Sequence, residues 1–261
     1  MMVTSQVFDS ISPWILFLFI IFFLLLAFDI GRRAGIIVER RWPDEAEANV
    51  AAKVGAALTI LAFLLAFVVN LTLNTFNEKR QLVISEANAI GTAYLRAGYL
   101  PEPYKSESRQ LLHEYIDFRL KVVDPTKSQV AIAQSEQIQD KLWVIVEQVA
   151  TETPTPTASL YISSINDLID IHTQRLTSEI GFRLPLSFTL GLLGVSMLVM
   201  VLIGISDSYR ERNNRLALVV IVVLVALVFL LIIGMDRSNI GLVRVPLTPL
   251  IDLQQKLGTL P

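Results

Sequence analysis

The chain has 261 residues, of which 53% are hydrophobic and only 18% are charged. Because a soluble domain carries roughly a quarter charged residues, this composition indicates a membrane protein. A formal net charge of -2 and the lack of a stretch rich in Lys and Arg exclude a basic surface for nucleic acid. With no cysteine and two histidines, the chain lacks the ligands of common zinc and iron–sulfur sites, so no metal site and no cofactor is predicted.

Four long apolar stretches predict transmembrane helices. A hydrocarbon core about 30 Å thick needs about 20 helical residues, whereas strands of a membrane barrel would alternate in polarity over about 10 residues. The stretches are residues 13–28, 54–73, 184–205 and 216–235. The predicted fold class is therefore all-α, with four transmembrane helices. The predicted domains are 1–74 (N-terminal tail and first two spans), 75–183 (extramembrane helical bundle), 184–235 (last two spans) and 236–261 (C-terminal tail).

Positive charges gather in the two short connections between spans. The first connection holds Arg32, Arg33, Arg40, Arg41 and Lys53, and the second holds Arg210, Arg212 and Arg215. The N-terminal tail carries Asp9 and no cation. By the positive-inside rule both connections are cytoplasmic. The N-terminus, the segment 75–183 and the C-terminal tail are then predicted to lie outside, which is the periplasm for a bacterial inner membrane.

The segment 75–183 has an ordinary soluble composition, and its apolar residues repeat with helical spacing. Its turns are marked by Pro101 with Pro103, by Asp124–Pro125 and by Thr153–Pro156. These breaks predict four helices of about 20 to 28 residues that pack as antiparallel neighbours. Residues 70–90 hold neither Pro nor Gly, so the second span is predicted to continue out of the membrane as one helix.

No group of residues predicts catalysis. His113 and His172 lie at unrelated positions, and no phosphate loop or nucleophile motif is present, so the chain is predicted not to be an enzyme. His172 lies near Asp170 and could act as a general base, but a histidine that is either exposed to solvent or packed between helices is the better interpretation. Glu86 and Arg96 belong to a polar series with helical spacing, which favours a salt-bridged helix face over a functional network. Asp29 is interpreted as an ion-pair partner of the arginines that follow it.

Amide side chains line one face of the second predicted helix where it leaves the membrane. Asn70, Asn74, Asn77 and Gln81 recur at steps of four, three and four residues. Such amides either hydrogen-bond to neighbouring helices or line a wet vestibule at the mouth of a pore. Because they carry no charge, they do not suit a proton relay.

The third span begins with a stripe of large apolar residues beside a stripe of small ones. Leu184, Phe188 and Leu192 form the first stripe, and Ser187, Gly191 and Gly194 form the second. Small residues allow close helix packing. In a ring of subunits, the large stripe would face the common axis and form a hydrophobic constriction, or neck. Ordinary packing within a helix bundle is the alternative interpretation.

Several motifs resemble the bestrophin-like domain family of bacterial and plant membrane proteins. Residues 85–97, which read SEANAIGTAYLRA, and residues 100–104, which read LPEPY, are similar to that family. The tail from Asp236 to Leu250 is similar to the family's closing pattern, with Ser238 and Asn239 in place of the usual Pro and Phe. The function of the family is unknown, and it is named for its similarity to bestrophins, which are pentameric anion channels.

The bestrophin neck follows a Pro-x-Ser-Phe-x-Leu-Gly stretch, and residues 185–191 match that stretch. The resemblance implies a neck formed by Leu184, Phe188 and Leu192, a homo-oligomer such as a pentamer, and an inorganic anion such as chloride as the permeant ion. No acidic cluster resembles the bestrophin calcium clasp, so calcium gating is not implied.

Two functions from different classes remain open at this point. The first is a bestrophin-like ion channel, with the amide face as a vestibule and the third span as a neck. The second is a non-conducting membrane scaffold or envelope sensor that binds a partner through its helical bundle. A transporter is a third possibility. A ring of subunits around an axial opening would favour the channel.

Overall fold

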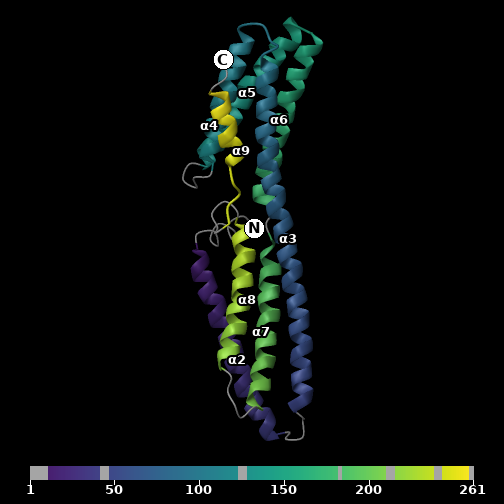
Figure 1. The fold of residues 1–261 in the computed structure, drawn as a ribbon, viewed down its shortest axis with the longest axis vertical. Helices are drawn as coiled ribbons and strands as arrows, with labels where there is room; N and C mark the ends of the chain where they lie inside the picture. The colour runs from purple at the N-terminus through teal and green to yellow at the C-terminus, as the bar shows by residue number, and fades with distance from the viewer. Residues whose placement is uncertain are drawn as a thin grey trace. The chain divides into compact units, whose positions relative to one another are not determined.

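The computed structural model describes residues 11–41, 47–122, 128–181, 184–209, 215–237 and 243–258. Across these ranges every regular element is an α-helix, which confirms the predicted all-α class (Figure 1). The helices are α2 (Pro13–Arg41), α3 (Glu47–Ala97), α4 (Tyr104–Lys121), α5 (Ser128–Glu152), α6 (Pro156–Gly181), α7 (Leu186–Ser208), α8 (Arg215–Asp236) and α9 (Thr248–Leu257). The sequence motif residues Asp9, Arg210, Arg212, Ser238 and Asn239 lie outside the described residues.

Four helices are long and apolar enough to cross a membrane, as predicted, and the protein is an integral membrane protein. They are α2, α3, α7 and α8. Helix α3 has 51 residues without a break, which at 1.5 Å per residue gives a length of roughly 75 Å. Because a hydrocarbon core is only about 30 Å thick, α3 continues beyond the membrane as one helix.

The chain divides into two compact units. Residues 1–75 and 184–244 form the first, here called the membrane unit, and residues 76–183 and 245–261 form the second, here called the bundle unit. The C-terminal tail, which was predicted as one segment, is therefore shared between the two units. It also contains a helix, α9, that the sequence did not predict.

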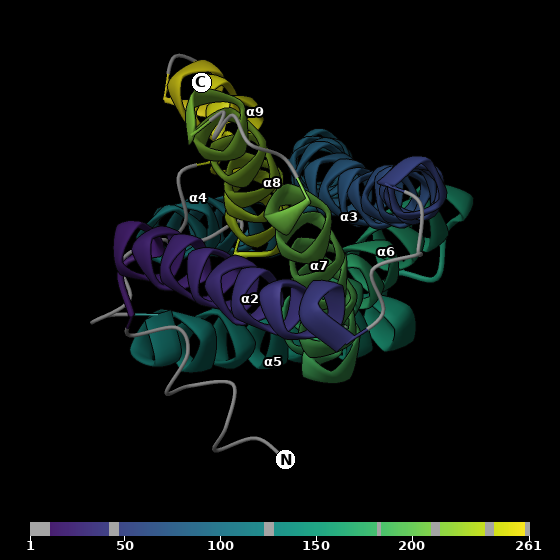
Figure 2. The ribbon, with the colours of Figure 1, turned by 90° about the horizontal axis from the view of Figure 1, so that it is seen from below.

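In the membrane unit, glycines bring α2 and α7 into close contact. A Cβ atom on Gly31 would collide with the carbonyl oxygen of Val201, and one on Gly204 would collide with that of Phe28. Figure 2 shows these two helices crossing. In lipid no hydrophobic effect drives two helices together. Small residues let the backbones approach closely, and the resulting van der Waals contacts stabilise the pair.

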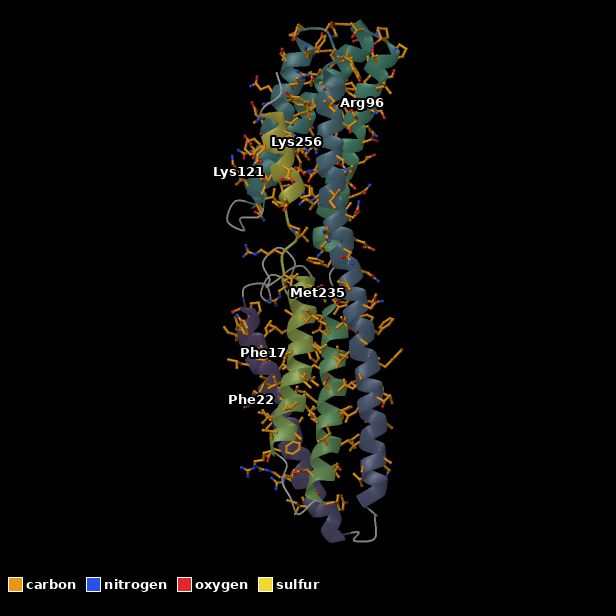
Figure 3. All side chains as sticks on the ribbon, viewed as in Figure 1. Phe17, Phe22, Arg96, Lys121, Met235 and Lys256 are labelled. Atoms are coloured by element: carbon orange, nitrogen blue, oxygen red, sulfur yellow. The ribbon has the colours of Figure 1, made fainter. Side chains whose placement is uncertain are left out.

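Large apolar residues fill the interior of the membrane unit and also cover its outside. Leu24, Leu61, Met200 and Phe229 are buried together. Residues such as Phe22 on α2 are exposed (Figure 3). Exposed apolar side chains on transmembrane helices are suited to contact with lipid tails.

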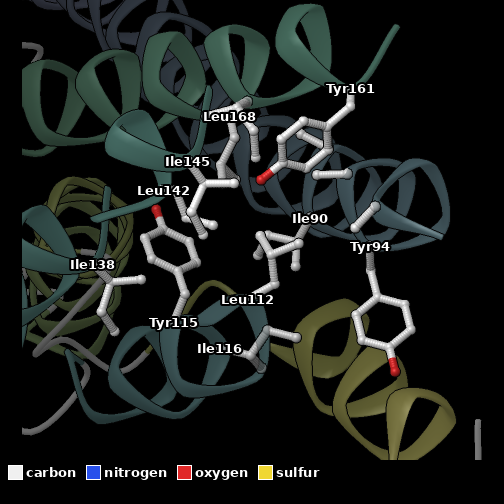
Figure 4. Close-up of a cluster of buried hydrophobic side chains, with 14 of the residues drawn as sticks. Ile90, Tyr94, Leu112, Tyr115, Ile116, Ile138, Leu142, Ile145, Tyr161 and Leu168 are labelled. Atoms are coloured by element: carbon white, nitrogen blue, oxygen red, sulfur yellow. The ribbon is translucent and has the colours of Figure 1, made fainter. Parts of the chain in front are cut away.

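The bundle unit has its own core, formed by α4, α5, α6, α9 and the C-terminal part of α3. Ile90, Leu112, Tyr115, Leu142 and Tyr161 are completely buried in it (Figure 4). Burial of each such large side chain stabilises the fold by roughly 1.5–3 kcal/mol. This core holds the polar cluster described below in a fixed position.

Helix α9 docks on the bundle through apolar and polar contacts. Leu250 and Leu257 are buried, and the side-chain amide of Gln254 donates a hydrogen bond to Asp117 Oδ1 at 2.5 Å. Pro249 lies in the first turn of α9, where its missing N–H costs nothing. The helix therefore closes one side of α4.

Candidate functional site

Within the membrane unit, α3 has one face covered by its own chain and one face that is open. Leu61, Leu65 and Val68 are buried. Phe63 is 69% exposed and Phe67 is 52% exposed. At about 100° per residue these two aromatic residues lie on the side of α3 opposite the buried residues.

The predicted amides continue this open face along the same helix. Asn70, Asn74, Asn77 and Gln81 are all exposed, and at helical spacing they lie in line with Phe63. None of the four side chains has a hydrogen-bond partner among the described residues. Bonds to another helix of the same chain, one of the two predicted roles, are therefore not observed in the part of the chain that the structure describes.

The three residues of the predicted neck lie in different environments. Leu184 is half-buried against the core of the membrane unit, Phe188 is 53% exposed, and Leu192 is 6% exposed within that core. Leu192 is thus covered by its own chain, which the helical repeat alone did not reveal. A neck on α7 would present mainly Phe188 and the edge of Leu184.

The neighbouring small-residue stripe on α7 is open. A Cβ atom added to Gly191 or Gly194 would meet nothing within 4 Å. These two glycines differ in this respect from Gly31 and Gly204, whose neighbours are backbone atoms of the facing helix. The two ends of α7 therefore have different packing roles within the chain.

A buried ionic cluster joins the four long helices of the bundle unit. Arg119 Nε of α4 donates to Glu86 Oε1 of α3 at 2.7 Å, and Arg175 Nη1 of α6 donates to Glu86 Oε2. The hydroxyl group of Tyr115 lies 3.2 Å from Glu86 Oε1 and 3.0 Å from His172 Nδ1. Gln139 of α5 donates to the same hydroxyl group at 3.2 Å. The Glu86 carboxylate thus binds α4 and α6 directly, and it is linked to α5 through the hydroxyl group of Tyr115.

The surroundings of the cluster fix its charge state. Burial pushes the pKa of Glu86 upward, but the guanidinium groups of Arg175 and Arg119 outweigh it and hold the pKa below its ordinary value. Burial, together with Arg119, lowers the pKa of His172 to about 4. Burial and the nearby Glu86 raise the pKa of Tyr115. At neutral pH the cluster therefore contains one carboxylate, two guanidinium groups, a neutral imidazole and a neutral phenol.

Sequence reasoning identified part of this cluster. It favoured a solvated or a packed histidine over a general base at His172, and the side chain is packed, with 2% of it exposed. It grouped Glu86 with Arg96 on one helix face, but Arg96 donates to the backbone carbonyl of Leu160 at 2.9 Å instead. The partners of Glu86 come from 33 and 89 residues further along the chain. One feature of the sequence could have predicted the buried carboxylate: Glu86 lies within the apolar helical stripe of Val83, Ala87 and Ile90.

Helix α2 carries an ion pair between residues one helical turn apart. Arg33 Nε lies 2.8 Å from Asp29 Oδ2, which confirms the predicted ion pair. Among the described residues, no three His, Asp or Glu side chains are grouped so as to hold a metal ion. Within the described ranges, the open face of α3 and the buried cluster are the features considered as candidate sites.

The sequence model of the bestrophin-like domain family matches residues 18–250. The chain belongs to this family. Among solved structures, a bacterial bestrophin homologue from Klebsiella pneumoniae is similar with a TM-score of 0.67 and 16% identity, over 93% of this chain and 100% of the other. A point variant of that homologue gives 0.67 and 16%, over 91% and 97%. No curated protein matches the chain. At this identity the likeness to the homologue establishes a shared fold for this bestrophin-like protein.

Proposed function

We propose that this bestrophin-like protein assembles with further copies of itself into an ion channel that conducts anions. The observation that carries the proposal is the open face of α3, where exposed Phe63 and Phe67 lead into exposed Asn70 and Asn74. A pentamer like that of bestrophins is the expected assembly. The fold shared with a bestrophin homologue supports the same interpretation.

The order of residues on this face fits a pore wall. Phenyl groups cannot replace the water molecules that hydrate an ion. A ring of Phe63 and Phe67 side chains would therefore form a dry constriction. The amides that follow would keep water beside the constriction. In lipid, the same amides would be left without hydrogen-bond partners at a cost, so an aqueous or protein surface suits them better.

The chemistry of the face favours anions over cations. Each amide has two N–H donors that can bind an anion, but it also has a carbonyl oxygen and no charge, so the preference depends on the neighbouring groups. The edge of an aromatic ring carries partial positive charge, and it can point toward an anion that passes through a ring of phenyl groups. No carboxylate lies in the row from Phe63 to Asn74, so nothing in this row repels an anion.

Helix α7 provides the other candidate neck, formed by Leu184, Phe188 and Leu192. It follows from the match to the bestrophin neck stretch and stays a prediction. The burial of Leu192 in its own chain weakens it, because that side chain cannot also face an axis without leaving the core. Either neck is compatible with the proposed channel, and one experiment distinguishes the two positions.

The experiment measures chloride flux into liposomes that contain the purified full-length protein. We expect flux from the native protein, and we expect the Phe63→Ala/Phe67→Ala variant to raise it, because truncation lets the constriction become wet. The Leu184→Ala/Phe188→Ala variant should leave flux unchanged if α3 forms the neck. Phe19→Ala/Phe22→Ala is the matched control, since it truncates two exposed aromatic residues of α2.

Three outcomes decide between the alternatives. A rise in flux confined to the α3 variant supports the proposed neck, and a rise confined to the α7 variant transfers the neck to that helix. If the native protein and all variants are folded and oligomeric but pass no halide, the channel proposal is wrong. The non-conducting scaffold or sensor would then be the better interpretation.

A further inference from the structure

The imidazole of His172 lies in the bundle unit with one nitrogen bonded and one nitrogen buried without a partner. Nδ1 is 3.0 Å from the hydroxyl group of Tyr115. Nε2 is buried and has no hydrogen-bond partner among the described residues. Buried polar atoms of native proteins are nearly always paired, so each exception needs an explanation.

Neither neutral form of the ring removes this exception. If Tyr115 donates its proton to Glu86, Nδ1 must carry a proton and donate to the phenol, which leaves a bare lone pair on Nε2. If Tyr115 donates to Nδ1, then Nε2 carries the proton and has no acceptor. In either case the buried nitrogen has lost its hydrogen bond to water without gaining another.

The charges that face His172 oppose a second proton on the ring. Among the described residues, the charged groups that act on the ring are the negative Glu86 of α3 and the positive Arg119 of α4 and Arg175 of α6, and Tyr115 is a neutral phenol. Helix α5 contributes only the uncharged Gln139, through the hydroxyl group of Tyr115. An imidazolium would add a third cation around one carboxylate, and its Nε2–H would have no acceptor.

We propose that His172 is an acid-sensitive lock of the bundle unit, which holds α6 against α3 and α4 while neutral and releases it when protonated. Above about pH 4, a proton from solvent binds the imidazole mainly when the packing around α6 opens and water reaches the ring. Acid therefore favours the opened bundle. The inference does not depend on the channel proposal, because it concerns the folding equilibrium of the bundle alone.

The size of the effect follows from the proton affinities of the two states. With a pKa of about 4 in the packed state and 6.5 in the opened state, opening is favoured about 30-fold at pH 5 relative to pH 7.5. The change begins as the pH falls below about 6.5 and ends near pH 4. This window separates it from the titration of ordinary carboxylates.

Hydrogen exchange on the full-length protein in nanodiscs tests the lock. After correction for intrinsic exchange, amides of α4 and α6 around the cluster should open about 30-fold more readily at pH 5 than at pH 7.5. His172→Gln should lose most of this dependence, because Gln cannot be protonated. His113→Gln, at the other histidine of the chain, should keep it. An equal pH dependence in the native protein and in His172→Gln would overturn the proposal.

A second measurement keeps the native His172. In His113→Gln, labelled with ¹⁵N-histidine, the remaining ring should give NMR signals of a neutral imidazole down to about pH 5. Signals that change to those of an imidazolium near pH 6.5 while the bundle stays protected from exchange would show that the packed state accepts the proton. The lock would then be refuted even if the Gln variant failed to fold.

Discussion

The carboxylate of Asp236 accepts a hydrogen bond from the backbone N–H of Leu184 at 2.8 Å. Asp236 is the last residue of α8, and Leu184 lies two residues before the start of α7. The residue at the N-cap position of α7 is Pro185, which has no side-chain oxygen to accept an N–H. Asp236 therefore supplies, from another helix, a carboxylate near the start of α7, where the helix dipole favours negative charge.

We expect Asp236→Ala to lower the free energy of unfolding by about 0.5–2 kcal/mol, the usual cost of losing a capping side chain. Asp236→Asn should lose less, because its amide oxygen still accepts the Leu184 N–H without the charge. The measurement is denaturant unfolding of the purified protein in micelles. Equal stability of the Ala variant and the native protein would show that the bond contributes nothing.

The contact between α2 and α7 predicts a second, larger effect. Gly204→Ala places a methyl group against the carbonyl oxygen of Phe28, and overpacking of this kind costs typically 1–3 kcal/mol. Gly194→Ala is the matched control on the same helix, because the added carbon meets nothing within 4 Å. The control should be neutral or slightly stabilising, since Ala favours a helix over Gly by roughly 0.5–1 kcal/mol. A thermal melt of both variants checks the ordering.

Removal of the buried carboxylate predicts the largest loss. Glu86→Gln removes the negative charge that Arg119 Nε and Arg175 Nη1 bind, and breaking a buried pair costs roughly 3–5 kcal/mol. Asp29→Asn breaks an exposed ion pair with Arg33 and should cost no more than about 1 kcal/mol. Unfolding of both variants at pH 7 gives the comparison. A Glu86→Gln variant as stable as Asp29→Asn would contradict the role assigned to the cluster.

The same carboxylate predicts a dependence on acid that differs from that of His172. The folded-state pKa of Glu86 is held below 4.5, so its contribution to stability is complete above that pH. It is lost as the pH falls through the lowered folded-state pKa. Acid unfolding of His172→Gln should therefore still occur, but below about pH 4.5. If that variant were insensitive to acid throughout, Glu86 would not be the remaining titrating group.

The sequence predicted the transmembrane helices because a long apolar run without charges can satisfy its backbone hydrogen bonds in lipid by forming a helix. It predicted the continuity of α3 because residues 70–90 lack Pro and Gly. It did not reveal α9, because a segment of ten residues is too short for its apolar spacing to predict a helix. The contact with α4 makes the apolar face recognisable. Helical spacing placed Leu192 in one stripe with Phe188, but it could not show that Leu192 lies in the core while Phe188 is exposed. The partners of Glu86 lie on other helices, so only the folded bundle reveals them.

The final prediction concerns the orientation in the membrane. The short connections of the membrane unit carry the arginines, so we expect them in the cytoplasm and the bundle unit outside, in the periplasm of a bacterial inner membrane. The chain has no cysteine, so single-cysteine variants can be labelled without background. In intact cells, a membrane-impermeant maleimide should label Lys121→Cys, on the exposed surface of α4. It should not label Asn214→Cys, which lies outside the described residues, until the membrane is permeabilised. The reverse pattern would place the bundle in the cytoplasm, although the helices and their contacts would be the same.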